Sequence, residues 1–314
     1  MDKRTLNRIL LGWILLLIIV ALIGKVSVAA PNGGQTSADF LNIGLGARPA
    51  GMGGAYSAVG EGAGAAYWNP AGLKSVQSGE VTLGHFAWYQ DITYEQGVFA
   101  HKVNERSSFA ATVGYLNYGD IDGRDAAGLS TGNVSVYDWY GAVSWGYSVS
   151  PEFSVGVTGK FVAEKLDDIS ASTFAADIGF LWHLDRITVA AVASNIGPDM
   201  DYEGYSEHLP SAARIGLAVR PWGENILTAI DLEKSFYGDV VLRNGLEYGY
   251  LNQYFVRAGY SFYPEADNRS FGSGLSVGAG VRFEQFDFDY AYTLKEDYAS
   301  DELHRFSVSL RFGR

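Results

Sequence analysis

From residue 80 onward, apolar and polar residues alternate along the chain in one short segment after another. In the segment 153–165, Phe153, Val155 and Val157 fall on one face, whereas Thr158 and Lys160 fall on the other. A period of two residues with one apolar and one polar face predicts β-strands. The pattern and the turn residues between the segments predict fourteen strands, at residues 80–89, 94–103, 107–117, 134–148, 153–165, 173–184, 187–194, 211–220, 225–235, 240–250, 254–263, 274–283, 285–294 and 304–312.

The connections between the predicted strands differ in length in a regular way. Every second connection is short, namely 104–106, 149–152, 185–186, 221–224, 251–253 and the region around 284. Most of the others are long, namely 118–133, 195–210, 264–273 and 295–303, although 90–93 and 236–239 are not. Outer-membrane barrels have short periplasmic turns, longer external loops and aromatic residues at both membrane interfaces. The predicted fold class is therefore all-β, a transmembrane antiparallel β-barrel of about 14 strands.

The first thirty residues have the three parts of a secretory signal peptide. Lys3, Arg4 and Arg8 precede an apolar run over residues 9–23, and small residues lead up to Ala29-Ala30. The alternative is an uncleaved anchor helix, but the run is short for a membrane span of about 20 residues. We therefore expect cleavage near Ala29 or Ala30, export, and a location in the outer membrane of a Gram-negative bacterium.

The next segment has a different composition. Residues 31–79 are rich in Gly and Ala and lack clear alternation. A short helix is expected near 37–43, with Ser37 or Asp39 as its N-cap. So many small residues allow close backbone approach, as a segment packed inside a barrel would need. We predict three parts, which are a signal peptide at 1–30, a plug or hatch at 31–79 and the barrel at 80–314.

The polar faces of the predicted strands carry charges of both signs among many glycines. We expect these charges to face the lumen, where opposite charges can pair and the glycines leave room for the plug. The alternative is a water-filled pore with solvated wall charges. The lumen-facing candidates are Lys160, Asp177, Arg214, Arg243, Glu247, Arg257, Arg282, Asp287 and Asp289.

Composition and motifs exclude several classes of function. The net charge of −12 argues against a nucleic-acid partner. The chain has no cysteine, which excludes disulfides and a cysteine-anchored lipoprotein. The histidines lack metal-ligand spacing, and the nearest serine–histidine pair, Ser307 and His304, is expected on opposite faces of one strand. We expect no enzyme, no cofactor and no metal site, and we interpret acidic clusters in the loops as solvated rather than as calcium sites.

Two runs in the Gly/Ala-rich segment carry a family likeness. They read Phe-Leu-Asn-Ile-Gly-Leu-Gly-Ala-Arg-Pro-Ala-Gly-Met-Gly-Gly-Ala-Tyr at 40–56 and Tyr-Trp-Asn-Pro-Ala-Gly-Leu at 67–73. In this order, just after a signal peptide, they resemble the opening of the PorV/PorQ family, a branch of the FadL-like outer-membrane proteins. The resemblance implies a fourteen-stranded barrel with an N-terminal hatch that contains an Asn-Pro-Ala element. The hatch motif residues are Gly44, Gly46, Arg48, Gly51, Gly53, Gly54, Asn69, Pro70 and Ala71.

The Asn69-Pro70 pair makes a rigid turn, because proline fixes φ and removes a donor while asparagine bonds its own backbone. A turn that only positions the plug and an element with a role in function are both open interpretations.

The resemblance implies two different functions. FadL-like proteins pass hydrophobic molecules across the outer membrane and release them through an opening in the barrel wall. PorV instead serves the type IX secretion system by escorting secreted cargo to the attachment machinery, and the modest predicted loops argue against a large cargo-binding cap. The expected partners are outer-membrane lipid and either a small hydrophobic ligand or secretion-system proteins. A structural or adhesive surface barrel is a further alternative.

Overall fold

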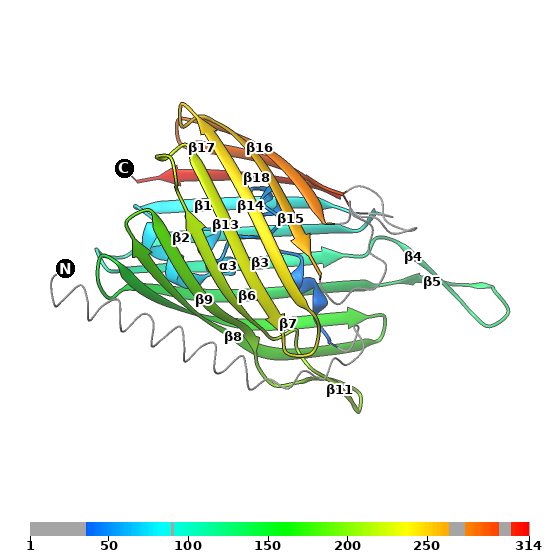
Figure 1. Ribbon diagram of the computed structural model, residues 1–314. Helices are drawn as coiled ribbons and strands as arrows, with labels where there is room; N and C mark the ends of the chain where they lie inside the picture. The colour runs from blue at the N-terminus through cyan, green and yellow to red at the C-terminus, as the bar shows by residue number, and fades with distance from the viewer. Residues whose placement is uncertain (1–35, 89–90, 264–273, 295–302, 314) are drawn as a thin grey trace.

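Fourteen strands form one closed antiparallel barrel in the computed structural model, which describes residues 36–88, 91–263, 274–294 and 303–313 (Figure 1). Around the barrel the strands follow the order β1-β18-β17-β16-β15-β14-β13-β12-β9-β8-β7-β6-β3-β2. They are β1 (Gly79–Ala87), β2 (Thr93–Lys102), β3 (Ser107–Asn117), β6 (Val136–Ser148), β7 (Phe153–Leu166), β8 (Ile169–Leu184), β9 (Ile187–Ile196), β12 (Ala212–Val219), β13 (Ile226–Ser235), β14 (Val240–Tyr250), β15 (Tyr254–Phe262), β16 (Leu275–Phe283), β17 (Phe286–Thr293) and β18 (Leu303–Phe312). The predicted fold class, an all-β transmembrane barrel of 14 strands with an N-terminal plug, is confirmed.

The alternation in the sequence places polar residues inside the barrel and apolar residues outside it. On β7 the inward Ser154, Thr158 and Lys160 are buried, whereas the outward Val157 is exposed. Pairing of β1 with β18 closes the sheet, so the barrel has no free edge. A closed barrel satisfies every backbone group internally, which a structure inside a bilayer must do.

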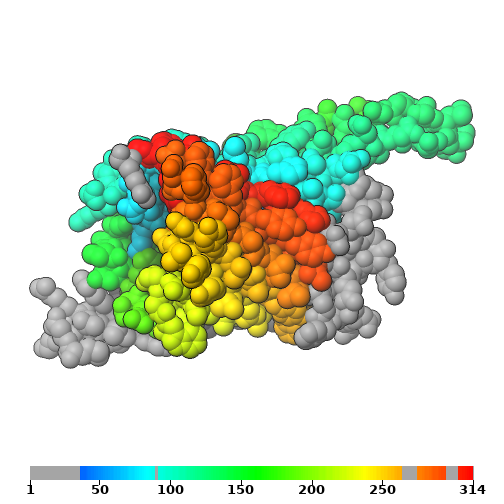
Figure 2. All heavy atoms as spheres, turned by 90° about the horizontal axis from the view of Figure 1, so that it is seen from above, coloured from blue at the N-terminus to red at the C-terminus, as the bar shows by residue number. Residues whose placement is uncertain are grey.

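The two ends of the barrel differ. At the end that we call the short-turn end, strands are joined by tight connections such as 149–152, 185–186 and 251–253. At the opposite end, the long-loop end, two long connections contain hairpins, which are β4 (Ile121–Arg124) with β5 (Ser130–Val134) and β10 (Met200–Tyr202) with β11 (Tyr205–Glu207). Figures 1 and 2 show the β4–β5 hairpin extending away from the barrel.

The long connections predicted at 118–133 and 195–210 are present, and each contains a short hairpin that the alternation pattern did not predict. The β4–β5 hairpin is short and largely exposed, so it lacks the apolar face that reveals a strand in sequence. Strand β10 buries Met200 but is only three residues long, which is too short for a visible alternation. The connection between the predicted strands 153–165 and 173–184 is shorter than expected: it is a two-residue turn with Asp167 at φ 55, and β8 begins at Ile169. The predicted connection 264–273, and 295–303 up to residue 302, lie outside the described residues.

Residues 36–78 fill the barrel lumen, and we call this segment the plug. It contains η1 (Asp39–Asn42), α2 (Ala47–Gly51), α3 (Ala65–Trp68) and η2 (Pro70–Ser75). Among the described helices, none is long and apolar enough to cross a membrane.

The plug starts at the long-loop end of the barrel. There Thr36 bridges to His208, and the Ser37 amide donates to the His208 carbonyl. The helix expected at 37–43 is a short 3-10 turn with Ala38 at its N-cap and no side-chain cap, so the cap predicted at Ser37 or Asp39 was wrong. The Ser37 hydroxyl instead donates to the carbonyl of His208, and the Asp39 carboxylate accepts from Thr36. The predicted signal peptide lies outside the described residues, and the boundaries at 30/31 and 79/80 stay a proposal.

Candidate functional site: the plugged lumen

Three glycines on neighbouring strands let the Asn-Pro-Ala element rest directly on the barrel wall. Gly146 on β6 is paired with Gly156 on β7, which is paired with Gly179 on β8. A Cβ atom at Gly156 would lie 2.2 Å from the carbonyl carbon of Pro70, and one at Gly179 would lie 2.1 Å from Oδ1 of Asn69. We call these three residues the first glycine seat. At Gly156 the backbone of the plug touches the backbone of the wall, and at Gly146 and Gly179 the missing wall side chain leaves room for Leu73 and Asn69.

A second glycine seat lies on β14, β15 and β16, under the glycine-rich end of α2. It consists of Gly245, Gly259 and Gly278. A Cβ atom at Gly259 would lie 2.0 Å from the amide nitrogen of Gly53, and Gly53 itself has φ +63. Only glycine combines that close approach with a left-handed backbone at low cost. The glycines of the predicted hatch motif are therefore needed both for the turns of the plug and for its contact with the wall.

Asn69 ties the two sides of the first seat together with its side chain. It is fully buried, and its Nδ2 donates to the carbonyls of Ser57 in the plug and Phe180 on β8. Its Oδ1 accepts from the Ala71 amide, and Pro70 then starts η2. Asn69 is thus more than a turn residue in the structure, while its role in function stays a proposal.

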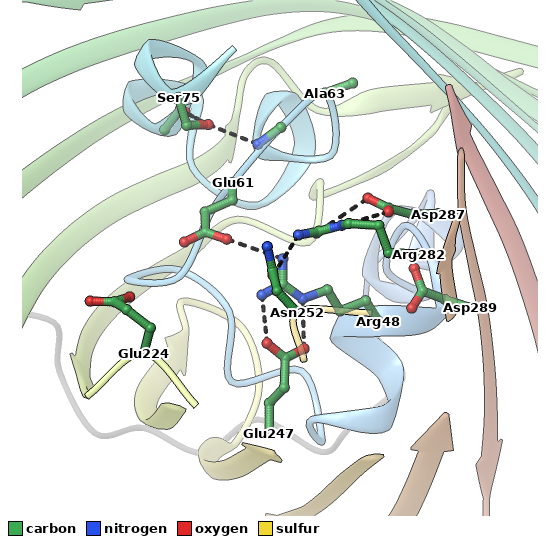
Figure 3. Close-up of polar contacts among 12 residues, drawn as sticks. Arg48, Glu61, Ala63, Ser75, Glu224, Glu247, Asn252, Arg282, Asp287 and Asp289 are labelled. Atoms are coloured by element: carbon green, nitrogen blue, oxygen red, sulfur yellow. Dashed lines mark hydrogen bonds and ion pairs between the residues drawn. The ribbon is translucent and has the colours of Figure 1, made fainter. Parts of the chain in front are cut away.

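A network of buried charges holds α2 against the opposite wall (Figure 3). The Arg48 guanidinium donates from Nε and Nη2 to the two oxygens of Glu247 on β14, each at 2.8 Å. Its Nη1 lies 3.2 Å from Oε2 of Glu61, whose other oxygen lies 2.7 Å from Arg220. On the wall, Arg257 bridges Glu247 at 2.5 Å and Asp289 at 2.6 Å. Plug and barrel therefore share one ion-pair network.

The other lumen-facing candidates also point inward and are paired. Lys160 lies 2.8 Å from Asp177, and Arg282 lies 2.8 Å from Asp287. Glu233 accepts from both Arg214 and Arg243. Asp231 is fully buried and accepts from the amides of Tyr56 and Ser57 in the plug. The structure thus brings wall carboxylates into contact with the plug backbone as well as with arginines.

Sequence reasoning missed two members of the network, Glu61 and Arg220. Glu61 lies in a Gly/Ala-rich run without periodicity, so it carries no face assignment. Arg220 is the last residue of the predicted strand 211–220, on the same face as Arg214, and the alternation could have found it. In the described ranges, no three His, Asp or Glu side chains form a group that could hold a metal ion.

The plug leaves two cavities along the same wall, lined mainly by β16, β17, β18 and β1. The cavity at the long-loop end has a volume of about 360 Å³, and the cavity at the short-turn end has about 320 Å³. Helix α2 contributes Ala50 to the first and Arg48 and Pro49 to the second, so it separates them. Both cavities border α2, so a small solute that moves from one to the other must pass this helix.

Glu61 makes the plug sensitive to acid. Burial raises the pKa of the Glu61 carboxyl, but Arg48 and Arg220 outweigh burial and hold the pKa below its usual value. Such a carboxyl stabilises the fold above its unfolded pKa of about 4.3, and this contribution is lost as the pH falls through the folded pKa. We expect ion conductance through the purified barrel in planar bilayers to rise below about pH 4. In Glu61→Gln the contribution is missing at all pH values, so conductance should start higher and change less. Identical pH profiles for the two proteins would contradict this role.

Comparison with known proteins agrees with the fold and identifies a family. The solved structures with a similar fold include the Pseudomonas putida toluene transporter TodX, with a TM-score of 0.65 and 14% identity over 86% of this chain and 98% of that chain. The CymD monoaromatic hydrocarbon channel gives 0.60 and 15% identity over 87% of this chain and 98% of that one. A Pseudomonas aeruginosa FadL homologue gives 0.57 and 13% identity over 86% and 98%. At such identities the likeness shows the fold alone, and no curated protein matches the sequence significantly.

The family model described as type IX secretion system protein PorV matches residues 29–220, which is more than half of the chain and includes the plug. The chain is an outer-membrane β-barrel that belongs to the PorV family of type IX secretion system proteins.

Proposed function

We propose that the barrel takes up a small amphipathic molecule, with an apolar body and one anionic group, through the cavity at its long-loop end. The observation that carries the proposal is Arg305 in that cavity. Its guanidinium carbon lies 4.5 Å from the centre of the Phe86 ring, and its buried Nε has no hydrogen-bond partner. Across the described residues no carboxylate forms an ion pair with Arg305, unlike the other inward arginines of β12–β18. A buried guanidinium without a counter-charge favours an anionic ligand.

The remaining lining supports an apolar body for the ligand. Trp68, Phe86, Trp88 and Tyr263 line the cavity, together with Asp39 and with Arg243, whose guanidinium is paired with Glu233. A volume of about 360 Å³ is in the range of small-molecule pockets. The solved relatives named as toluene and monoaromatic hydrocarbon channels favour a hydrophobic cargo. A neutral hydrocarbon would gain nothing from two arginines, so the anionic group is specific to this proposal.

The two cavities also suggest a route for the ligand through the lumen. A displacement of α2 from the second glycine seat would join the cavity at the long-loop end to the cavity at the short-turn end. The ion pairs of Arg48 resist the displacement, and so do the hydrogen bonds of Ser276 and Ser261 to the Gly53 backbone and of Ser307 to the Ala47 amide.

Binding of decanoate to the detergent-folded protein tests the proposal. We expect Arg305→Leu to weaken binding of decanoate by roughly 10-fold to 100-fold, since hydrogen bonds to charged groups contribute about 1.5–3 kcal/mol. Binding of decanol should change little. Isothermal titration calorimetry measures both affinities. The matched control is Arg186→Leu, which removes an exposed arginine from a turn at the short-turn end.

Equal affinity for decanoate and decanol would remove the anionic group from the proposal. Absence of binding for either probe would favour the structural or secretion alternatives.

A second candidate function is the type IX secretion role for which the family is named. The family match favours it, and so does the β4–β5 hairpin, which projects at the long-loop end with both edges unpaired among the described strands. An unpaired edge can accept a strand from another chain. Replacing residues 121–134 by a Gly-Ser linker should release cargo from the cell surface while leaving decanoate binding unchanged. Unchanged surface retention of cargo would count against this candidate.

A further inference from the structure

One hydrogen-bonded histidine–glutamate pair lies on the outer, lipid-facing side of the barrel. His85 on β1 and Glu95 on β2 are directly opposite each other, and Nδ1 of His85 lies 2.6 Å from Oε1 of Glu95. Their side chains are 46% and 54% exposed. Among the described residues of the barrel strands, all other Asp and Glu side chains alternate into the lumen. Glu95 is therefore an exception to the pattern that builds this barrel.

The surroundings of this pair are apolar. Leu83, Val113 and Phe306 are exposed around it, on β1, β3 and β18. Gly97 on β2 is paired with both Leu83 and Val113, so the missing side chain leaves a groove between them. The groove has a volume of about 450 Å³, and His85 and Glu95 lie along its lining. Two polar side chains beside an apolar groove are unfavourable against lipid tails, because polar and charged groups on the lipid face of a barrel destabilise it.

The polar atoms of this pair are also only partly hydrogen-bonded. Within the described part of the chain, one oxygen of Glu95 and one nitrogen of His85 bond each other, and their remaining polar atoms have no partner. Hydrocarbon supplies no partner for those atoms. Together, the free acceptor of Glu95 and the free ring nitrogen of His85 form a surface that is complementary to itself. A two-fold axis along the membrane normal, passing between the two strands, would place each Glu95 opposite the His85 of the other copy.

We propose that the outer wall formed by β18, β1, β2 and β3 is the interface of a homodimer, in which the His85–Glu95 pairs of two copies hydrogen-bond across a two-fold axis. Leu83, Val113 and Phe306 supply the apolar contact around this polar centre. A second copy fits better than an unrelated partner, because it needs no charge that this chain does not already present.

The interface would also be linked to the plug. Gln96 and Ser307 line the groove, and both hold the plug with their side chains. Gln96 donates to the Gly44 carbonyl at 2.8 Å, and the Ala47 amide donates to the Ser307 hydroxyl at 3.0 Å. These plug residues lead directly into α2. Dimerisation would therefore contact the two strands whose side chains, Gln96 and Ser307, hold the plug at the start of α2.

Cysteine cross-linking in native outer membranes tests the interface, and the chain helps because it contains no cysteine. Leu83→Cys lies on the proposed interface, and Leu217→Cys lies on β12, on the opposite side of the barrel. With a short bis-maleimide, we expect Leu83→Cys to give a band at twice the monomer mass and Leu217→Cys to give none. Adding Glu95→Leu should reduce the dimer band at least tenfold. The charge exchange His85→Glu with Glu95→His should restore it, because it preserves the self-complementary pattern.

A faster gel mobility before boiling than after it confirms that each variant has folded as a barrel. A cross-linked band of any other mass would overturn the proposal in favour of a different protein partner. Absence of any cross-link in folded Leu83→Cys would overturn it in favour of lipid alone. Neither outcome depends on decanoate binding, so failure here is separable from failure of the proposed uptake.

Discussion

Gly156→Val should displace the plug from the barrel wall and open the lumen to ions. The added Cβ would meet the carbonyl carbon of Pro70 at 2.2 Å and the amide nitrogen of Ala71 at 2.3 Å. Both are backbone atoms of the plug, which cannot rotate away as a flexible side chain can. We therefore expect the Asn-Pro-Ala element to leave the first glycine seat and Asn69 to lose its bond to Phe180. Planar bilayer recording should show conductance several times that of the wild type.

The matched control for this experiment lies three positions along the same strand. Gly159 faces outward, and a Cβ there would meet nothing within 4 Å. Gly159→Val should fold, show heat-modifiable mobility and conduct like the wild type. If Gly156→Val folds as a barrel and conducts no more than Gly159→Val, the plug does not rest on this seat.

Glu247→Leu should weaken attachment of the plug at the opposite wall by about 3–5 kcal/mol. The substitution removes the partner of two guanidinium groups, Arg48 in the plug and Arg257 in the wall. Arg257 keeps its ion pair with Asp289, and Arg48 keeps its ion pair with Glu61. Each arginine nevertheless loses the more buried of its two carboxylate partners. Removal of one partner from a buried pair leaves charge uncompensated, which is far more costly than loss of an exposed pair.

Hydrogen exchange measured by mass spectrometry gives the size of this effect. Amides in residues 44–60 should exchange roughly 100-fold faster or more, since each 1.4 kcal/mol is a factor of ten. The control is Glu224→Leu, because the Glu224 side chain is 88% exposed and lies 3.3 Å from Arg220. Its effect should stay within about 1 kcal/mol. Equal exchange in the two variants would show that the buried network does not hold the plug.

Much of the barrel could be predicted because its physics is local. An inward or outward position follows from the alternation of residues along one strand, and turn residues mark the ends. Strands β4 and β5 were not predicted, because both faces of the hairpin are largely exposed and the sequence therefore shows no alternation of apolar and polar residues. The predicted helix cap was wrong for a different reason, since the Ser37 hydroxyl donates to the carbonyl of His208, which is far away in sequence.

The candidate site was predictable only in part for the same reason. The polar strand faces indicate that Gly156, Gly259 and Glu247 point inward. They do not indicate which plug residue meets each of them, because that depends on how the plug folds. Arg48 could be assigned to the hatch by resemblance, but its pairing with Glu247 joins residues 199 positions apart.

The path of the plug has a consequence for assembly of the protein. The chain enters the lumen at the long-loop end, where Thr36 meets His208, and leaves it at the short-turn end, where Lys74 donates to the Pro151 carbonyl. Only then does β1 begin, and β1 is one side of the β1–β18 seam. A finished ring would have to draw the N-terminal segment through a lumen in which backbone touches backbone at Gly156 and Gly259. We therefore expect the strands to gather around the N-terminal segment before the β1–β18 seam closes.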